Sequence, residues 1–142
     1  MNGIAFDADV LIYAASEHPL APRIARLFAG AVDQPVGIGS VLLLTEVLAK
    51  PLRTDPESAE VAALAGLLSR LDLRPLDEAT ARLALALAVA YGLRTADAAH
   101  LATAVAGGAD RFLTNNRKGF PQTIAEIDIV YPDELPDAPV VP

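Results

Sequence analysis

The spacing of apolar and polar positions changes repeatedly along this chain between two patterns. Short apolar runs alternate with longer stretches in which apolar residues return every three or four positions; the runs are typical of strands and the stretches of amphipathic helices. Strands are predicted at residues 3–6, 36–39, 71–74, 111–113 and 127–131. Helices are predicted at residues 10–15, 21–32, 41–50, 57–70, 76–91 and 96–106. Because strands and helices alternate, we expect an α/β fold, a three-layer α/β/α sandwich with a mostly parallel central sheet.

Capping and breaking residues bound several of these helices. Polar residues with good N-cap chemistry precede three of them, and glycine or proline follows three. The predicted N-caps are Asp9, Ser40 and Thr95. The predicted stops are Pro51, Gly92 and the pair Gly107–Gly108.

The length of 142 residues fits one domain. We expect it to span residues 1–131, followed by a tail at 132–142 that is rich in proline and acid and too poor in apolar groups to join the core. The longest apolar stretch, residues 83–93, is too short to span a membrane, and the N-terminus lacks the features of a secretory signal. Together with the absence of cysteine, this predicts a cytoplasmic protein with no membrane contact.

The net charge of −7 argues against a protein that holds nucleic acid by a broad basic surface. Any contacts with phosphate must be local. The candidates are Arg117 and Lys118, which follow the predicted strand at 111–113, and Lys50 and Arg53, which end the helix that carries Glu46. For the second pair, scattered solubilising charge is the alternative reading.

Polar side chains gather where parallel strands would end. Asp7 follows the first strand and Thr114 to Asn116 follow a later one, Asp97 opens the helix before that strand, and Glu46 lies in a helix that is apolar almost all round. In a parallel sheet these strand ends share one edge, where ligands bind. Carboxylate and amide oxygens suit Mg²⁺ or Mn²⁺, which can activate water and screen a phosphodiester during hydrolysis.

Each of these residues also has a structural reading. Asp97 suits the helix dipole and Asp9 a helix cap, whereas Glu46 could pair with Lys50 one turn later. A buried, unpaired Glu46 would be costly, and this favours a functional role for it and, by the same argument, for Asp7. His100 is interpreted as a hydrogen-bonded structural residue outside the site, and Asp110 as a turn residue.

Four segments in register, 6–13, 40–47, 95–104 and 108–116 with Phe120, resemble the successive motifs of PIN-domain ribonucleases, particularly the VapC-type toxins. The resemblance covers nearly the whole chain. It implies that Asp7, Glu46 and Asp97 are the acidic metal-site residues, that Thr114 is a supporting hydroxyl, and that Asp9 fills the small polar position of the first motif.

The same resemblance implies an endoribonuclease that uses Mg²⁺ or Mn²⁺, acts on RNA, forms a homodimer and is neutralised by a small VapB-type antitoxin. Asn116 would complete the metal site, but its position is often an aspartate in this family. An amide supplies an oxygen without a charge, so the affinity for metal is expected to be lower than with aspartate.

Two other functions are compatible with parts of the sequence. A catalytically dead PIN domain could serve as a binding module, with Asn116 as the lesion. The segment Asp7-Ala-Asp9-Val10 also resembles the nucleophile motif of haloacid-dehalogenase-type phosphatases, but Leu11 departs from that motif, and the lysine and acidic pair of that family are not found.

Overall fold

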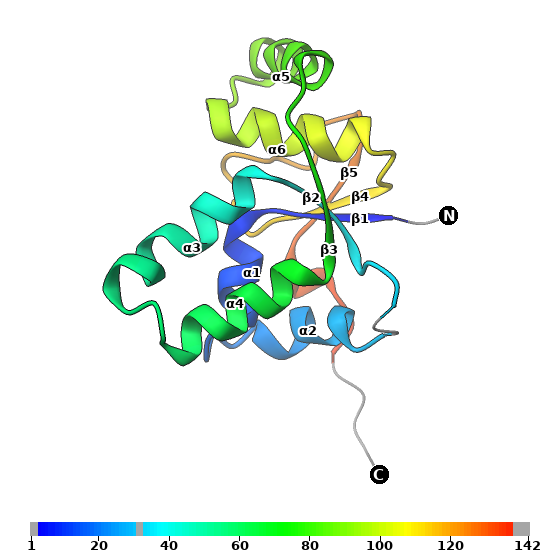
Figure 1. The fold of residues 1–142 in the computed structure, drawn as a ribbon. Coiled ribbons are helices and arrows are strands. Elements are labelled where there is room, and N and C mark those ends of the chain that lie inside the picture. Colours follow the sequence, from blue (N-terminus) through cyan, green and yellow to red (C-terminus); the bar gives the residue numbers. More distant parts are fainter. Residues whose placement is uncertain (1–2, 31–32, 138–142) are drawn as a thin grey trace.

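Five parallel strands form one sheet at the centre of the molecule (Figure 1). The computed structural model describes residues 3–30 and 33–137. The strands run in the order β3-β2-β1-β4-β5. Their bounds are β1 Ile4–Phe6, β2 Gly37–Ser40, β3 Leu71–Arg74, β4 Arg111–Leu113 and β5 Asp128–Val130. Every neighbouring pair is parallel, so the expected sheet is confirmed, and all its carboxyl ends lie along one edge.

Helices cover both faces of this sheet, which confirms the three-layer sandwich. Figure 1 shows α1 to α4 on one side and α5 with α6 on the other. The helices are α1 Ala8–Ala14, α2 Ala21–Ala25, α3 Leu42–Thr54, α4 Ala59–Ser69, α5 Glu78–Tyr91 and α6 Thr95–Ala106. Two short 3-10 turns, η1 Arg26–Phe28 and η2 Pro132–Glu134, complete the described elements.

Several helix ends differ from the prediction. The first helix begins earlier, because Asp7 rather than Asp9 is its N-cap. The second loses α-helical geometry after Ala25 and ends as η1, while residues 31–32 lie outside the described part of the chain. Helix α3 continues past Pro51 to Thr54, whose hydroxyl donates to the carbonyl of Lys50 at 3.1 Å.

Two of the glycines that were expected to end helices, Gly92 and Gly108, adopt the left-handed conformation, whereas the N-cap of α6 differs from the prediction. Gly92 ends α5 in the left-handed conformation, with φ of 67°, which is costly for residues with a side chain. After α6, Gly108 takes the same conformation with φ of 75°. The N-cap of α6 is Arg94 rather than Thr95, and no side chain caps it.

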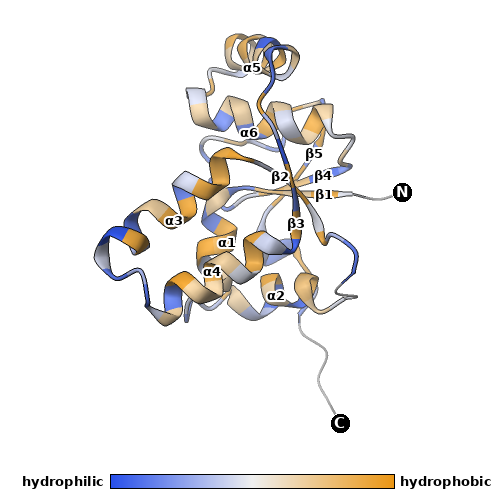
Figure 2. Cartoon of the chain, in the orientation of Figure 1, coloured by the Kyte–Doolittle hydropathy of each residue, from blue (hydrophilic) through white to orange (hydrophobic). Residues whose placement is uncertain are grey.

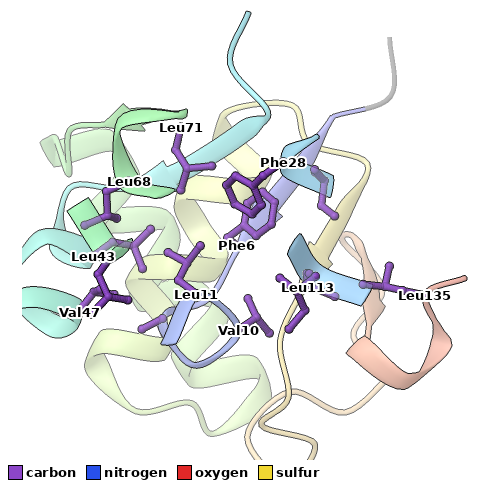
Figure 3. Close-up of a cluster of buried hydrophobic side chains, with 14 residues drawn as sticks. Phe6, Val10, Leu11, Phe28, Leu43, Val47, Leu68, Leu71, Leu113 and Leu135 are labelled. Atoms are coloured by element: carbon purple, nitrogen blue, oxygen red, sulfur yellow. The ribbon is translucent and has the colours of Figure 1, made fainter. Parts of the chain in front are cut away.

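The hydrophobic core has two parts, one on each face of the sheet. On the side of α1 to α4, Phe6, Leu11, Leu43 and Leu113 are buried together (Figure 3). On the other side, α5 and α6 pack against the sheet through side chains that include Leu101, Phe112 and Phe120. Figure 2 shows hydrophobic residues along the helices and strands, with hydrophilic residues interspersed on the helices and along β3.

The segment after β5 belongs to the first part of the core, contrary to the expectation for the tail. Leu135 is buried among the side chains labelled in Figure 3. Arg23 donates to the carbonyls of Asp133 at 2.8 Å and Leu135 at 3.0 Å, which fixes the segment against α2. A proline- and acid-rich composition therefore did not keep residues 132–137 off the core. Residues 138–142 lie outside the described part of the chain, and the domain boundary at 131 stays a prediction.

Among the described residues, no helix has both the length and the apolar character needed to cross a membrane.

Candidate active site

The carboxyl ends of β1 and β4 bring Asp7 and Thr114 together. The two strands pair with Phe6 opposite Leu113, and the amide of Asp7 donates to the carbonyl of Leu113 at 2.9 Å. Asp7 and Thr114, the residues that follow these two strands, therefore lie at the same edge of the sheet. Thr114 donates from Oγ1 to Oδ2 of Asp7 at 2.8 Å, and both side chains are buried. The predicted meeting of the two strand ends is confirmed.

The carboxylate of Asp7 is buried and accepts two hydrogen bonds. Its Oδ1 accepts from the amide of Ala8 at 2.8 Å, which is the N-cap bond of α1, while Oδ2 accepts from Thr114. Burial nevertheless raises the pKa of Asp7, and the two hydrogen bonds and nearby His100 only partly offset this effect. The side chain is therefore an acid whose ionised form gains from an added positive charge.

Asp9 lies two residues after Asp7, in the first turn of α1, and faces the loop after β4. Its Oδ2 accepts from the amide of Asn115 at 3.0 Å, which ties that loop to α1. Its Oδ1 is buried and has no hydrogen-bond partner in the described part of the chain. Burial first, and then the charge of Asp7, raises the pKa of Asp9 to about 7. A buried oxygen without a donor is a position that a cation or a water could satisfy.

Asp97 lies in the first turn of α6 and belongs to the same electrostatic group. Burial and the charges of Asp7 and Glu46 raise its pKa, whereas His100 and Arg94 act in the opposite direction. Asp7, Asp9 and Asp97 therefore all have raised pKa values. The sequence predicts that acids gather at one edge of the sheet. The effect of the charge of Asp7 on the pKa values of Asp9 and Asp97 agrees with this prediction.

Glu46 and His100 form a pair that the sequence did not predict. His100 is 2% exposed and donates from Nε2 to Oε1 of Glu46 at 2.8 Å, joining α6 to α3. The Glu46 side chain is 35% exposed and has a partner, so the argument from a buried, unpaired carboxylate was wrong in its premise. Glu46 therefore pairs with His100 and not with Lys50, the residue one turn later in the same helix. His100 is hydrogen-bonded, as expected, but its partner is one of the candidate site residues.

This contact was not predicted because the two residues lie 54 residues apart in the sequence, on different helices. The only local signal was the position of His100 three residues after Asp97, on the same face of α6. Its second ring nitrogen, Nδ1, is buried without a hydrogen-bond partner among the described residues. Asp110, in contrast, acts as predicted: its carboxylate accepts from the amide of Gly3 at 3.1 Å at the opposite end of the strands.

Asn116 shapes the loop that follows β4. Its amide donates to Oγ1 of Thr114 at 3.0 Å, and its own Oδ1 accepts from the amide of Gly119 at 3.0 Å. An ideal Cβ at Gly119 would lie 2.4 Å from Nδ2 of Asn116, so only glycine fits this turn without a shift. The side-chain oxygen is thus already used in a local turn, and its proposed role as a metal ligand stays a prediction.

The four cations expected to bind phosphate have different surroundings. Arg117 forms an ion pair with Asp133 at 2.6 Å, and its guanidinium lies 4.3 Å from the centre of the Tyr131 ring. Lys118 lines a hollow that also includes Asp97 and Asn116. Lys50 and Arg53 are exposed on the second half of α3 and do not line this hollow. Lys118 is therefore the best placed of the four for a ligand at the acidic site.

The donor atoms of the site are oxygens, which is the chemistry that Mg²⁺ and Mn²⁺ prefer. In residues 3–30 and 33–137, no three acidic or histidine side chains lie close enough to hold one ion together. Mg²⁺ is commonly held by one or two carboxylates and several waters. The raised pKa values and the unpartnered Oδ1 of Asp9 fit an ion of this kind beside Asp7 and Asp97.

Comparisons with known proteins agree with this geometry. A chain from a toxin–antitoxin complex of Klebsiella pneumoniae has 24% sequence identity and a TM-score of 0.71, with 92% of this chain and 98% of that chain covered. A chain from VapBC2 of Rickettsia felis, crystallised with a DNA fragment from the promoter, has 19% identity and a TM-score of 0.68, with coverage of 90% and 97%. At these identities the likeness concerns the fold.

A search of curated proteins gives no match. The PIN domain family, in contrast, matches residues 4–125, a stretch that contains both strand ends, the Glu46–His100 pair and Asp97. Members of this family are nucleases and generally use divalent metal ions. The match covers most of the chain, including the acids at the edge of the sheet. On this evidence the chain belongs to the PIN-domain family.

Proposed function

We propose that this PIN domain is a metal-dependent endoribonuclease that acts as the toxin of a toxin–antitoxin pair. The observation that carries the proposal is the convergence of Asp7 and Asp97, two acids with raised pKa values, beside the buried hydroxyl of Thr114. Such a group concentrates oxygen ligands where a divalent ion would relieve repulsion between the acids.

In this proposal Asp7 and Asp97 hold the ion, with Glu46 facing it from α3. Bound Mg²⁺ or Mn²⁺ would supply an activated water and neutralise charge on the phosphodiester. Thr114 fixes the orientation of Asp7, and His100 fixes that of Glu46, through their 2.8 Å hydrogen bonds. Asp9 anchors the loop that carries Asn116 by its contact with the amide of Asn115.

The direct test is cleavage of a labelled RNA by purified protein in EDTA, Mg²⁺ and Mn²⁺. We expect cleavage that stops in EDTA and returns with either ion, and that is lost in Asp97→Asn. Asp110→Asn is a matched control, because it makes the same chemical change at the opposite end of the sheet. Cleavage that persists in EDTA, or an Asp97→Asn variant with native turnover, would refute the assignment.

The toxin role rests on the likeness to chains from toxin–antitoxin complexes. We propose a small VapB-type antitoxin as the partner and a homodimer as the assembly, in the cytoplasm. Induced expression in bacteria should arrest growth and degrade RNA, and Asp7→Ala should abolish both effects. Light scattering of the purified protein measures the assembly, and a monomeric mass would contradict the homodimer.

The catalytically dead binding module is the remaining alternative. It predicts RNA or protein binding without cleavage in any metal, and the cleavage assay separates it from the nuclease. Membership of the PIN-domain family removes the phosphatase alternative.

A further inference from the structure

A hollow of about 380 Å³ lies directly beside the acidic site. One wall is formed by the end of α5 and the start of α6, including Tyr91, Arg94 and Asp97; the other is formed by the loop after β4, including Asn116 and Lys118. The volume lies within the roughly 300–1,000 Å³ of small-ligand pockets. Since Asp97 belongs to both the wall and the acidic site, a ligand in the hollow would adjoin the reacting group.

Two cations line this hollow, and both are exposed. Arg94 and Lys118 make no ion pair within the described residues, whereas Arg117 is committed to Asp133 and to the Tyr131 ring. The charge of Arg94 also lowers the pKa of Asp97, which places its guanidinium near that carboxylate. In a chain with a net charge of −7, this pair supplies positive charge beside the acids of the site.

Tyr91 contributes an aromatic side chain whose position is fixed. Its hydroxyl bonds to the Glu126 carboxylate and accepts from the amide of Ala125 at 3.2 Å. Pro121 adds a further apolar surface to the hollow. Aromatic rings held in this way are the usual stacking partners of unpaired bases, whereas duplex RNA keeps its bases stacked on one another.

We propose that this hollow binds one nucleotide of single-stranded RNA next to the phosphodiester that is cleaved. Arg94 and Lys118 contact the phosphate of that nucleotide, and the ring of Tyr91 contacts its base. The identity of the ligand rests on the proposed nuclease function. Arg94 and Tyr91 thereby join the site, although the sequence did not indicate either of them.

Binding of a fluorescent single-stranded RNA, measured in EDTA over a range of salt concentrations, tests the inference without turnover. Arg94→Met with Lys118→Met keeps the aliphatic stems and removes both charges. The affinity should fall about tenfold or more at low salt, and the slope of log K against log salt should become shallower by roughly 0.7, because the two charges together neutralise one phosphate.

Arg82→Met with Arg111→Met is the control for net charge. Arg82 is paired with Glu78 on the exposed surface of α5, and Arg111 begins β4 at the end of the sheet away from the site. This variant loses the same two charges and should keep most of the slope. Tyr91→Leu should weaken binding about 5- to 150-fold without a change of slope, while Tyr91→Phe, which keeps the ring but loses the contacts of the hydroxyl, should bind more tightly than Tyr91→Leu.

The outcomes separate the subsite from the nuclease activity. Equal affinity and slope for the two double variants would overturn the subsite, even if the native protein cleaves RNA. Duplex RNA bound as tightly as the single strand, or no binding of RNA at all, would overturn it too. Native protein that binds through the hollow but never cuts in Mg²⁺ or Mn²⁺ would leave the subsite standing and refute the proposed function. Melting curves confirm that each variant is folded.

Discussion

Thr114→Val would remove one hydroxyl group from the centre of the site and leave the shape of the side chain almost unchanged. That hydroxyl donates to Oδ2 of Asp7 at 2.8 Å and accepts from the amide of Asn116 at 3.0 Å. Thr114 itself is 0% exposed, so water cannot replace the lost group. Valine therefore leaves a buried carboxylate oxygen and a backbone amide without partners.

The expected loss follows from these two contacts. A hydrogen bond to a charged group contributes about 1.5–3 kcal/mol, and an amide left without a partner costs about 1 kcal/mol or more, so Thr114→Val should lose about 3 kcal/mol at high pH. Thr114→Ser keeps the hydroxyl and removes one methyl group, which should cost about 1 kcal/mol. The difference between the two variants isolates the hydroxyl.

The loss should also depend on pH. The Thr114 hydrogen bond favours the ionised form of Asp7 and so lowers its pKa; without it, burial raises that pKa further. The deficit of the valine variant is therefore largest where Asp7 is ionised and shrinks as falling pH protonates it.

Urea unfolding in EDTA at about pH 8 and about pH 5 measures both effects. Equal losses for valine and serine at the higher pH would refute the role of the hydroxyl. A valine deficit that is the same at both pH values would show that Asp7 does not titrate through this contact.

Three further predictions concern the acids around Asp7. In EDTA the melting temperature should fall as pH rises from about 5 to about 8, because acids with raised pKa values bind more protons in the folded chain than in the unfolded one; Mn²⁺ should restore it at the higher pH, and a flat profile would contradict this. His100→Ala should lower kcat in Mn²⁺ by about 10- to 100-fold, and His100→Gln, whose amide can still donate to Glu46, should retain more; native turnover in the alanine variant would show that the pair is not needed. Asn116→Asp should bind Mn²⁺ about tenfold more tightly and melt lower in EDTA, and an unchanged calorimetric titration would place the side chain outside the shell of the ion.

The parallel sheet, and the approach of Asp7 to Thr114 at its strand ends, could be predicted from the sequence. Strand and helix periods alternate clearly, and a parallel sheet then leaves one edge at which Asp7 and Thr114 can meet. Gly92 could be recognised as a helix end because a left-handed residue is favourable for glycine. These predictions depend on local chemistry and on one rule of topology.

Contacts between helices could not be predicted in the same way. His100 and Glu46 lie on different helices, and their rotation about the helix axes, which decides whether they face each other, depends on the packing of the whole layer. Burial of Glu46 was misjudged for the same reason. Asp7 replaced Asp9 as the cap of α1 because the strand ends one residue before Asp7, and the chain must turn at once.

Composition was a poor guide to the end of the chain and to Pro51. Buried Pro132 and Leu135, together with contacts from Arg23, Arg26 and Arg117, hold residues 132–137 on the core. Proline lacks an amide hydrogen, but α3 is already nine residues long at that point and continues for one more turn. At residues 132–137, tertiary contacts outweighed the local preference of the sequence.

The hydrogen bond between Thr114 and Asp7 spans 107 residues of sequence, and this has a consequence for the protein during its synthesis. A ribosome adds about 5–20 residues per second, so roughly 5–20 s separate the emergence of the two groups. β1 lies at the centre of the sheet, yet its neighbour β4 is made nearly last. A growing chain therefore carries the first acid of the site without the groups that orient it, and the centre is assembled only when synthesis is nearly complete.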